Sequence, residues 1–120
     1  MKPSEFDYRL WCKEDNSYWS FNDEQQRIIP RNDNIWEIEL WSGSKDKDGK
    51  KIFEGDVVSH RNYNDVEYRL KVVFNPERSS FEFICIESPA LYGFYGFFEE
   101  IPSNELKIIG NIHETKAEKE

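Results

Sequence analysis

The residues that could do chemistry begin with a short acidic motif, Asp46-Lys-Asp-Gly49. Alternating aspartates before a glycine are typical of calcium-binding loops, which hold the ion with carboxylate oxygens. With Gly49 at the glycine position of such a loop, however, Ser44 falls where the first aspartate belongs, and Gly55 falls where the bidentate glutamate belongs. Asp-Gly is also a preferred pair in tight turns that need a positive φ. We therefore predict a turn here and no calcium site.

The histidines and cysteines are too few and too widely spaced for a zinc site of the usual kind. His60, His113, Cys12 and Cys85 are the complete set, and no two of them have short ligand spacing. His60 follows Val58-Ser59 in a polar loop and His113 ends the last predicted strand, so we expect both at the surface. The sequence therefore predicts no metal, no cofactor and no catalytic residue, which disfavours an enzyme.

A third candidate is the aromatic segment at 92–98, where five aromatic side chains surround two glycines. It is either a strand buried in the core, with bulges at its glycines, or an interface that packs against another protein. A platform for stacking single-stranded nucleic acid is a further alternative, but it lacks the basic groove that this mechanism needs. The possible protein-interface residues are Tyr92, Phe94, Tyr95, Phe97 and Phe98.

One basic spot could contact nucleic acid, and it consists of Lys45, Lys47, Lys50 and Lys51 beside Trp41. Two aspartates interleave the lysines, which favours a solvated turn. The formal net charge of −8 also argues against a general duplex-DNA binder, because phosphate neutralisation needs clustered Lys and Arg. Nucleic acid is therefore an unlikely partner on this evidence.

Composition predicts one β-rich domain. The chain has 120 residues, of which 38% are hydrophobic and 16% aromatic, and aromatic residues fit a pleated, half-buried surface. The start of the chain has no apolar core of the signal-peptide kind, and no later run reaches membrane-spanning length. We therefore expect a cytoplasmic protein, without membrane association, in which Cys12 and Cys85 are reduced core residues.

Alternation of apolar and polar residues marks the strands that would position these groups. The clearest run is 66–74, where Val66, Tyr68, Leu70, Val72 and Phe74 share one face; residues 81–86 should pair back onto it as a hairpin. Other strands are expected at 6–12, 18–21, 35–41, 52–58 and 106–112, with a single helical turn at 102–105. We predict a small antiparallel barrel or sandwich with little helix. Residues 1–113 form the domain and 114–120 a disordered tail, while the conformation of 22–34 stays open.

Three blocks of the sequence resemble the YopX family of phage and prophage proteins. They are the central block from Trp41 to Val58, the closing block from Ile109 to Glu114, and the opening strand from Phe6 to Trp11. The resemblance implies a small, β-rich, cytoplasmic protein of phage origin with an SH3-like barrel component. It transfers no catalytic residue, because the biochemical function of the family is unknown.

These observations lead to one preferred function and two alternatives. We predict a non-enzymatic, phage- or prophage-derived module that binds protein or assembles, forming a homo-oligomer or meeting a phage or host protein. The first alternative is a single-stranded nucleic-acid binder that uses Trp36, Trp41 and the lysine loop. The second is an uncharacterised enzyme, for which no motif provides the residues.

Overall fold

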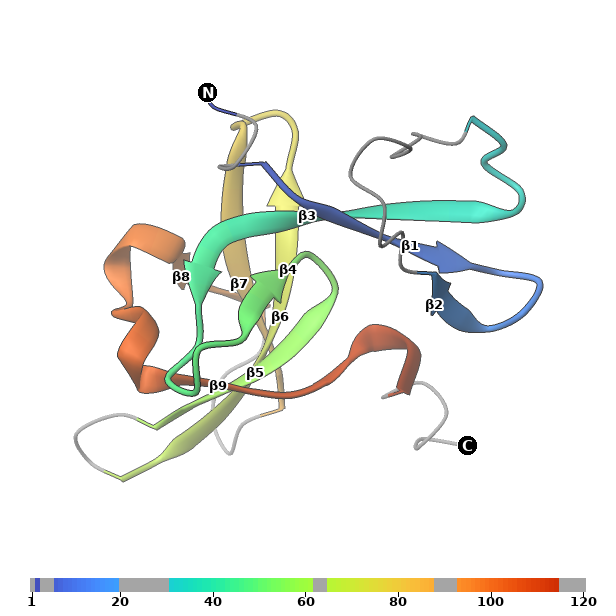
Figure 1. Ribbon diagram of the computed structural model, residues 1–120. Coiled ribbons are helices and arrows are strands. Elements are labelled where there is room, and N and C mark those ends of the chain that lie inside the picture. Colours follow the sequence, from blue (N-terminus) through green and yellow to red (C-terminus); the bar gives the residue numbers. More distant parts are fainter. Residues whose placement is uncertain (1, 3–5, 20–30, 62–64, 88–92, 115–120) are drawn as a thin grey trace.

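The computed structural model describes residues 2, 6–19, 31–61, 65–87 and 93–114. In these ranges the chain is mostly β and all strand pairs are antiparallel, as predicted. Two sheets form, with the strand orders β2-β1-β3-β4 and β8-β7-β6-β5-β9 (Figure 1). The strands are β1 (Tyr8–Cys12), β2 (Ser17–Trp19), β3 (Trp36–Lys45), β4 (Lys51–Phe53), β5 (Asp56–Arg61), β6 (Glu67–Asn75), β7 (Ser80–Glu87), β8 (Gly93–Phe97) and β9 (Leu106–Asn111).

The first sheet depends on β3, which is long enough to pair with β1 in its first half and β4 in its second. The register of β3 shifts between Trp41 and Lys45, where Gly43 has a φ of 91°. A positive φ suits glycine, and a bulge bends a strand. Figure 1 shows the result, because β3 curves away from β1 to reach β4.

The second sheet contains the predicted hairpin and most of the core. Strands β6 and β7 pair with Leu70 opposite Cys85 and Val72 opposite Phe83, which confirms the hairpin and its buried face. Tyr68 and Phe81 are half-buried and pack against the same cluster, as the alternation predicted. The buried core cluster is Ile52, Val58, Leu70, Val72, Phe83, Cys85 and Leu106.

The turns behave as their composition predicts. Gly49 and Gly55 have φ values of 83° and 89°, so each adopts a conformation that other residues rarely take. The expected helical turn is present as η4 (Ser103–Glu105), and a second short 3-10 helix, η3, spans Phe98–Glu100. Within the described ranges, no helix has the length and apolar character that crossing a membrane requires.

The remaining sequence predictions lie partly outside the described residues. Of the segment at 22–34, residues 22–30 are not described, and neither are 115–120 of the predicted tail. Residues 112–114 continue from β9 as a helical turn. The division into a domain at 1–113 and a tail therefore stays a prediction.

Candidate functional site

Arg9, in the middle of β1, contacts two carboxylates and two aromatic rings. Its Nε donates to Glu39 Oε1 at 2.7 Å, and Nη2 donates to Asp56 Oδ1 at 2.7 Å. The guanidinium carbon also lies 4.4 Å from the centre of the Tyr18 ring and 4.8 Å from that of Phe53. Arg9 therefore joins the first sheet to β5 of the second through charge-assisted bonds between aromatic rings.

Register explains why these residues meet. Residues directly opposite on antiparallel strands share a face of the sheet. Arg9 lies opposite Glu39, and Trp11 lies opposite both Glu37 and Tyr18. One face of the first sheet therefore carries all five side chains, and this is the face that alternation assigns to polar residues.

Glu39 is the acceptor that organises the site. It is 4% exposed, and its Oε1 accepts from Arg9 and from the Tyr18 hydroxyl at 2.9 Å. Its Oε2 lies 2.9 Å from His113 Nε2. Since a carboxylate only accepts, His113 donates this hydrogen bond. A Cβ at Gly55 would meet the Glu39 carboxylate at 3.0 Å, so the glycine leaves the space that this carboxylate fills.

His113 corrects a sequence prediction, because we expected it at the surface. Its side chain is 14% exposed, and its ring stacks on Trp11 with centroids 3.7 Å apart and planes 6° from parallel. The chain turns back at 112–114 and lays this histidine on the first sheet. The prediction was wrong because it placed the residue at the end of a strand, without the neighbouring sheet.

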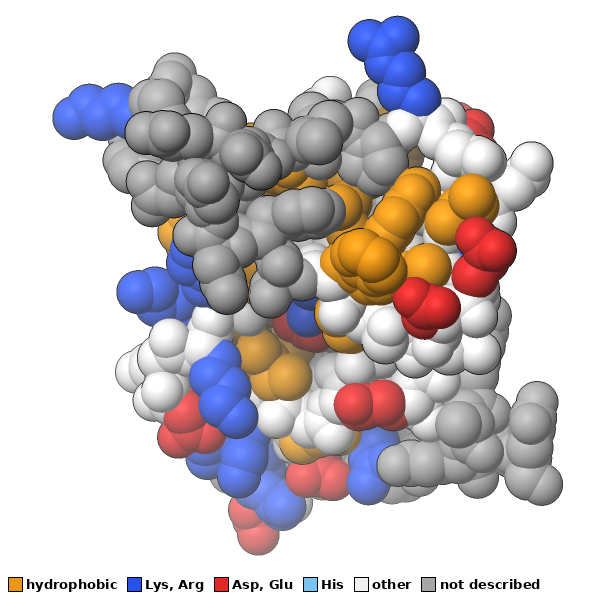
Figure 2. Space-filling view, turned by 45° about the vertical axis from the view of Figure 1, so that its right-hand side comes forward, with side chains coloured by type: hydrophobic (Ala, Val, Ile, Leu, Met, Phe, Trp, Pro, Cys, Tyr) orange, Lys and Arg blue, Asp and Glu red, His pale blue; other side chains and the backbone are white. Residues whose placement is uncertain are grey.

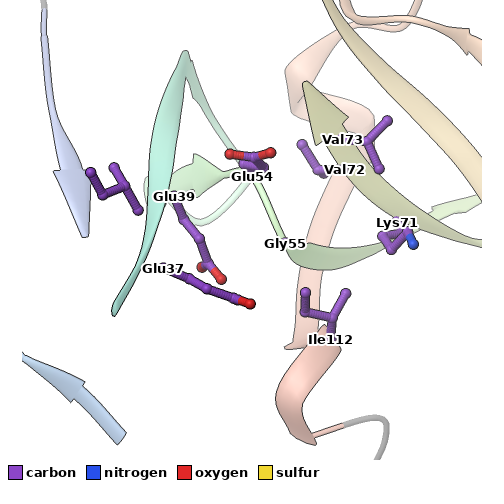
Figure 3. Close-up of a pocket in the computed structure, with 9 residues that line it drawn as sticks. Glu37, Glu39, Glu54, Gly55, Lys71, Val72, Val73 and Ile112 are labelled. Carbon is purple, nitrogen blue, oxygen red and sulfur yellow. The ribbon is translucent and has the colours of Figure 1, made fainter. Parts of the chain in front are cut away.

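A pocket of about 280 Å³ lies next to this network. Figure 3 shows the side chains of Glu37 and Glu39 pointing from β3 into it, with Glu54 above and Ile112 below. The opposite wall comes from β6, where Lys71 provides a cation. The pocket therefore has three carboxylates in its lining and one lysine.

Burial and neighbouring charges shift the pKa values of these groups. Burial alone would lower the pKa of Arg9, but Asp56 and Glu39 raise it, so Arg9 stays charged. Burial raises the pKa of Tyr18, which keeps its hydroxyl as a donor to Glu39. Burial also raises the pKa of Glu54; hydrogen bonding to the Leu40 backbone partly offsets this, and the charge of Glu39 adds to it.

The network is complete by itself. Among the described residues, no buried side-chain nitrogen or oxygen lacks a hydrogen-bond partner. Arg9, Tyr18 and His113 all bond to carboxylates. In the commonest pairing of a nucleophile with a base, a hydroxyl or thiol donates to a histidine. These contacts do not form that arrangement.

His60 is a second correction, because we expected a surface histidine in a polar loop. It lies in β5, is buried, and bonds through Nδ1 to the Tyr95 hydroxyl at 2.9 Å and through Nε2 to Glu105 at 3.0 Å. Its place opposite Tyr68 on β6 and Leu106 on β9 explains the burial. The hydrogen bond to His60 also holds Tyr95, one aromatic residue of the segment at 92–98, in place.

The aromatic segment forms a strand despite its glycines. Residues 93–97 form β8 on β7, with a register shift between Phe83 and Ile84, which agrees with the alternative of a core strand with a bulge. Tyr95 and Phe98 are half-buried and pack against the core, and the Phe98 ring stacks on Phe83 at 4.3 Å. Tyr92 and the side chains of Phe94 and Phe97 lie outside the described structure. An interface at this segment stays a prediction.

The lysine spot surrounds the Asp46 turn. Lys51 Nζ lies 4.5 Å from the centre of the Trp41 ring and 2.8 Å from Asp7 Oδ2, so one face of that ring has a cation over it. Asp46 accepts from the backbone amides of Asp48 and Lys50 through Oδ1 and from that of Ile108 through Oδ2. The turn is present, as the sequence predicted; Oδ1 serves the turn and Oδ2 joins it to β9. Lys45 pairs with Lys51 across β3 and β4, and Lys47 and Lys50 are exposed.

Sequence reasoning missed the cluster of Glu37, Glu39 and His113. One ligand atom from each lies within 4.8 Å of the others. The separation of 74 positions between Glu39 and His113 hides their contact from any local pattern. A usable signal was present nonetheless, since Trp11 shares the polar face of β1 with Arg9, and a large aromatic residue there indicates that the face is covered.

Comparison with known proteins gives a family and no individual relative. The sequence model of the family described as "YopX protein" matches residues 7–117, nearly the whole chain. No curated protein matches the sequence.

Proposed function

The chain belongs to the YopX family, and from that premise we propose that it is a phage-derived, non-enzymatic protein-binding module that associates with a second copy of itself. The observation that carries the proposal is an apolar surface on the first sheet. Of the four exposed large hydrophobic side chains among the described residues, Phe6 (41%), Trp19 (44%) and Ile38 (37%) belong to this sheet or the segment leading into it.

The register places Trp19 and Ile38 on a common face. They lie opposite Leu10 on either side of it. Leu10 is itself buried (1% exposed), so the exposed side chains flank a covered centre. The Trp36 ring meets the Trp19 ring edge-on at 5.2 Å, and Phe6 packs against Tyr8 at 5.7 Å. The part of the molecule that carries β1, β2 and the start of β3 faces forward in Figure 2, where hydrophobic side chains gather beside acidic ones.

The size of this surface fits weak self-association. Large hydrophobic side chains bury roughly 150–250 Å² when covered, so three that are about 40% exposed offer roughly 200–300 Å² per copy. At about 25 cal/mol per Å², burying this surface on both copies contributes roughly 10–15 kcal/mol of favourable free energy, before the cost of association is subtracted. Association costs about 4–15 kcal/mol in lost translational and rotational freedom, which offsets most or all of this gain, so a dimer through this surface should be weak and concentration-dependent. The net charge of −8 opposes association, and salt should therefore strengthen it.

A pair of variants tests the proposal. Replacing the two most central residues, as Trp19→Ser with Ile38→Ser, should make the protein monomeric at concentrations where the wild type associates. The control is Ile109→Ser, because Ile109 is 43% exposed but lies on β9 of the other sheet. Light scattering measures the molar mass of the double variant and of the control in solution. Association that survives the double change, or that Ile109→Ser abolishes, would overturn this surface as the interface.

Single-stranded nucleic-acid binding is the second candidate, and the Lys51–Trp41 pair favours it because base stacking and phosphate contact would lie side by side. The acidic net charge weighs against it. Fluorescence anisotropy with labelled oligonucleotides decides between the two. We expect no binding at micromolar protein and moderate salt, while saturable binding that Lys50→Glu with Lys51→Glu weakens would make this the first candidate.

An enzyme ranks third. Tyr18 and His113 bond to the Glu39 carboxylate and not to each other. The Tyr95 hydroxyl does meet His60, but His60 is buried and Tyr95 packs against the core cluster. We infer the cytoplasm as the compartment. Cys12 on β1 and Cys85 on β7 support that inference, because both are buried free thiols in different sheets.

A further inference from the structure

The clustered side chains of Glu37, Glu39 and His113 offer three donor atoms that point to one place beside the pocket. Glu37 and Glu39 are two positions apart on β3, so both side chains leave the same face of the strand. His113 reaches them from the turn that follows β9. We propose that these three side chains bind one divalent transition-metal ion, with Zn²⁺ as the best-suited candidate, and that the pocket provides its open coordination position.

The donor set is the first argument. An imidazole nitrogen with two carboxylate oxygens is a combination that Zn²⁺ accepts, and three protein ligands leave a fourth position for water or another ligand. All three donor atoms lie within 4.8 Å of one another. Zinc bonds of about 2.1 Å place tetrahedral donors about 3.4 Å apart. His113 Nε2 and Glu39 Oε2, now at 2.9 Å, therefore need to separate by about half an ångström.

Preorganisation is the second argument. Two of the three ligands are already held in place, because Arg9 and Tyr18 fix Oε1 of Glu39 and leave Oε2 toward His113. The His113 ring is fixed by its stacking on Trp11. Partners of this kind orient metal ligands and strengthen binding. Glu37 is exposed, so its side chain can adjust to complete the site.

Local charge is the third argument. The acidic groups around the site outnumber the basic ones: Glu37, Glu39, Glu54 and Asp56 against Arg9, Lys13 and Lys71. Lys13 Nζ lies 3.6 Å from Glu37 Oε1, where both side chains are exposed, and such pairs are weak. A divalent cation therefore enters a region with excess negative charge.

Binding changes the protonation of His113. Its Nε2 now carries the proton that bonds to Glu39, and the metal takes that nitrogen instead. In the neutral ring this proton moves to Nδ1, which frees the Nε2 lone pair for the metal, whereas a doubly protonated ring would release one proton to solvent. Ile38 also lines the pocket, but its side chain leaves the opposite face of β3 from those of Glu37 and Glu39, so the proposed metal ligands are separate from the apolar surface.

The experiment uses the full chain without a histidine tag and ZnCl₂ as the probe. The chain has two histidines, so ¹H–¹⁵N spectra of the imidazole rings resolve each one. Zn²⁺ should shift the His113 ring resonances and leave those of His60 in place. Titration calorimetry should give one site, with Glu37→Gln weakening the affinity about tenfold or more and His113→Gln abolishing saturable binding.

Glu77→Gln is the matched control, because Glu77 is exposed in the turn between β6 and β7 and should leave the affinity unchanged. Glu37→Gln keeps the test decisive if His113→Gln fails to fold, since Glu37 is exposed. Absence of saturable binding, a shift of His60 in place of His113, or wild-type affinity in Glu37→Gln would each overturn the proposal.

Discussion

The Asp46 carboxylate should hold the β3–β4 turn against β9, and Asp46→Asn tests this. Asp46 is 6% exposed and accepts three backbone amides at 2.9–3.0 Å. The side-chain oxygen of an asparagine can still accept from the amides of Asp48 and Lys50. Its NH₂ group then replaces the oxygen that accepted from the Ile108 amide, so two hydrogen-bond donors face each other there. An unsatisfied buried donor costs about 1–3 kcal/mol, and two bonds lose charge assistance. We expect a loss of about 3 kcal/mol in unfolding free energy.

The assay is urea unfolding followed by tryptophan fluorescence. The control is Asp48→Asn, an exposed aspartate in the same turn, which should change stability by less than about 0.5 kcal/mol. A loss below about 1 kcal/mol for Asp46→Asn would refute the reasoning. Burial alone would raise the pKa of Asp46, but the three amides lower it below its ordinary 3.8. The stabilisation is therefore present above that value and lost as the pH falls through the folded pKa, so the two proteins should converge in acid.

Two further changes test the core and the joint between the sheets. Leu70→Ala removes a fully buried side chain from the hairpin and should cost about 2–5 kcal/mol in a thermal or urea melt; unchanged stability would refute its place in the core. Gly55→Ala should cost more than about 1 kcal/mol, because the φ of 89° is strained for alanine and the new methyl group meets the Glu39 carboxylate. Gly49→Ala, with similar φ but open space around it, should cost less, and equal losses would show that Glu39 is not crowded.

The fold was predictable where a local pattern decides the structure. Period-two alternation predicted the β6–β7 hairpin, because both strands show their apolar residues locally and only a short turn separates them. Asp48-Gly49 predicted a turn for the same reason, since glycine tolerates the positive φ that such a turn needs.

The candidate site was not predictable, because it depends on which elements lie next to each other. Arg9 and Glu39 are 30 positions apart, and Arg9 and Asp56 are 47 apart. The alternation of polar and apolar residues on these strands indicates a polar face, and the polar face of a sheet is usually exposed to solvent. Here the second sheet and the turn at 112–114 cover it, so ion pairs and His113 become buried.

The mass of the purified chain in solution tests the central claim most directly. Sedimentation equilibrium should be run across a wide concentration range, at low and at moderate salt. We predict a monomer–dimer equilibrium that shifts toward dimer as concentration and salt increase, because salt screens the charge of −8 on each copy. A strict monomer at high concentration and moderate salt would contradict self-association through the apolar face of the first sheet.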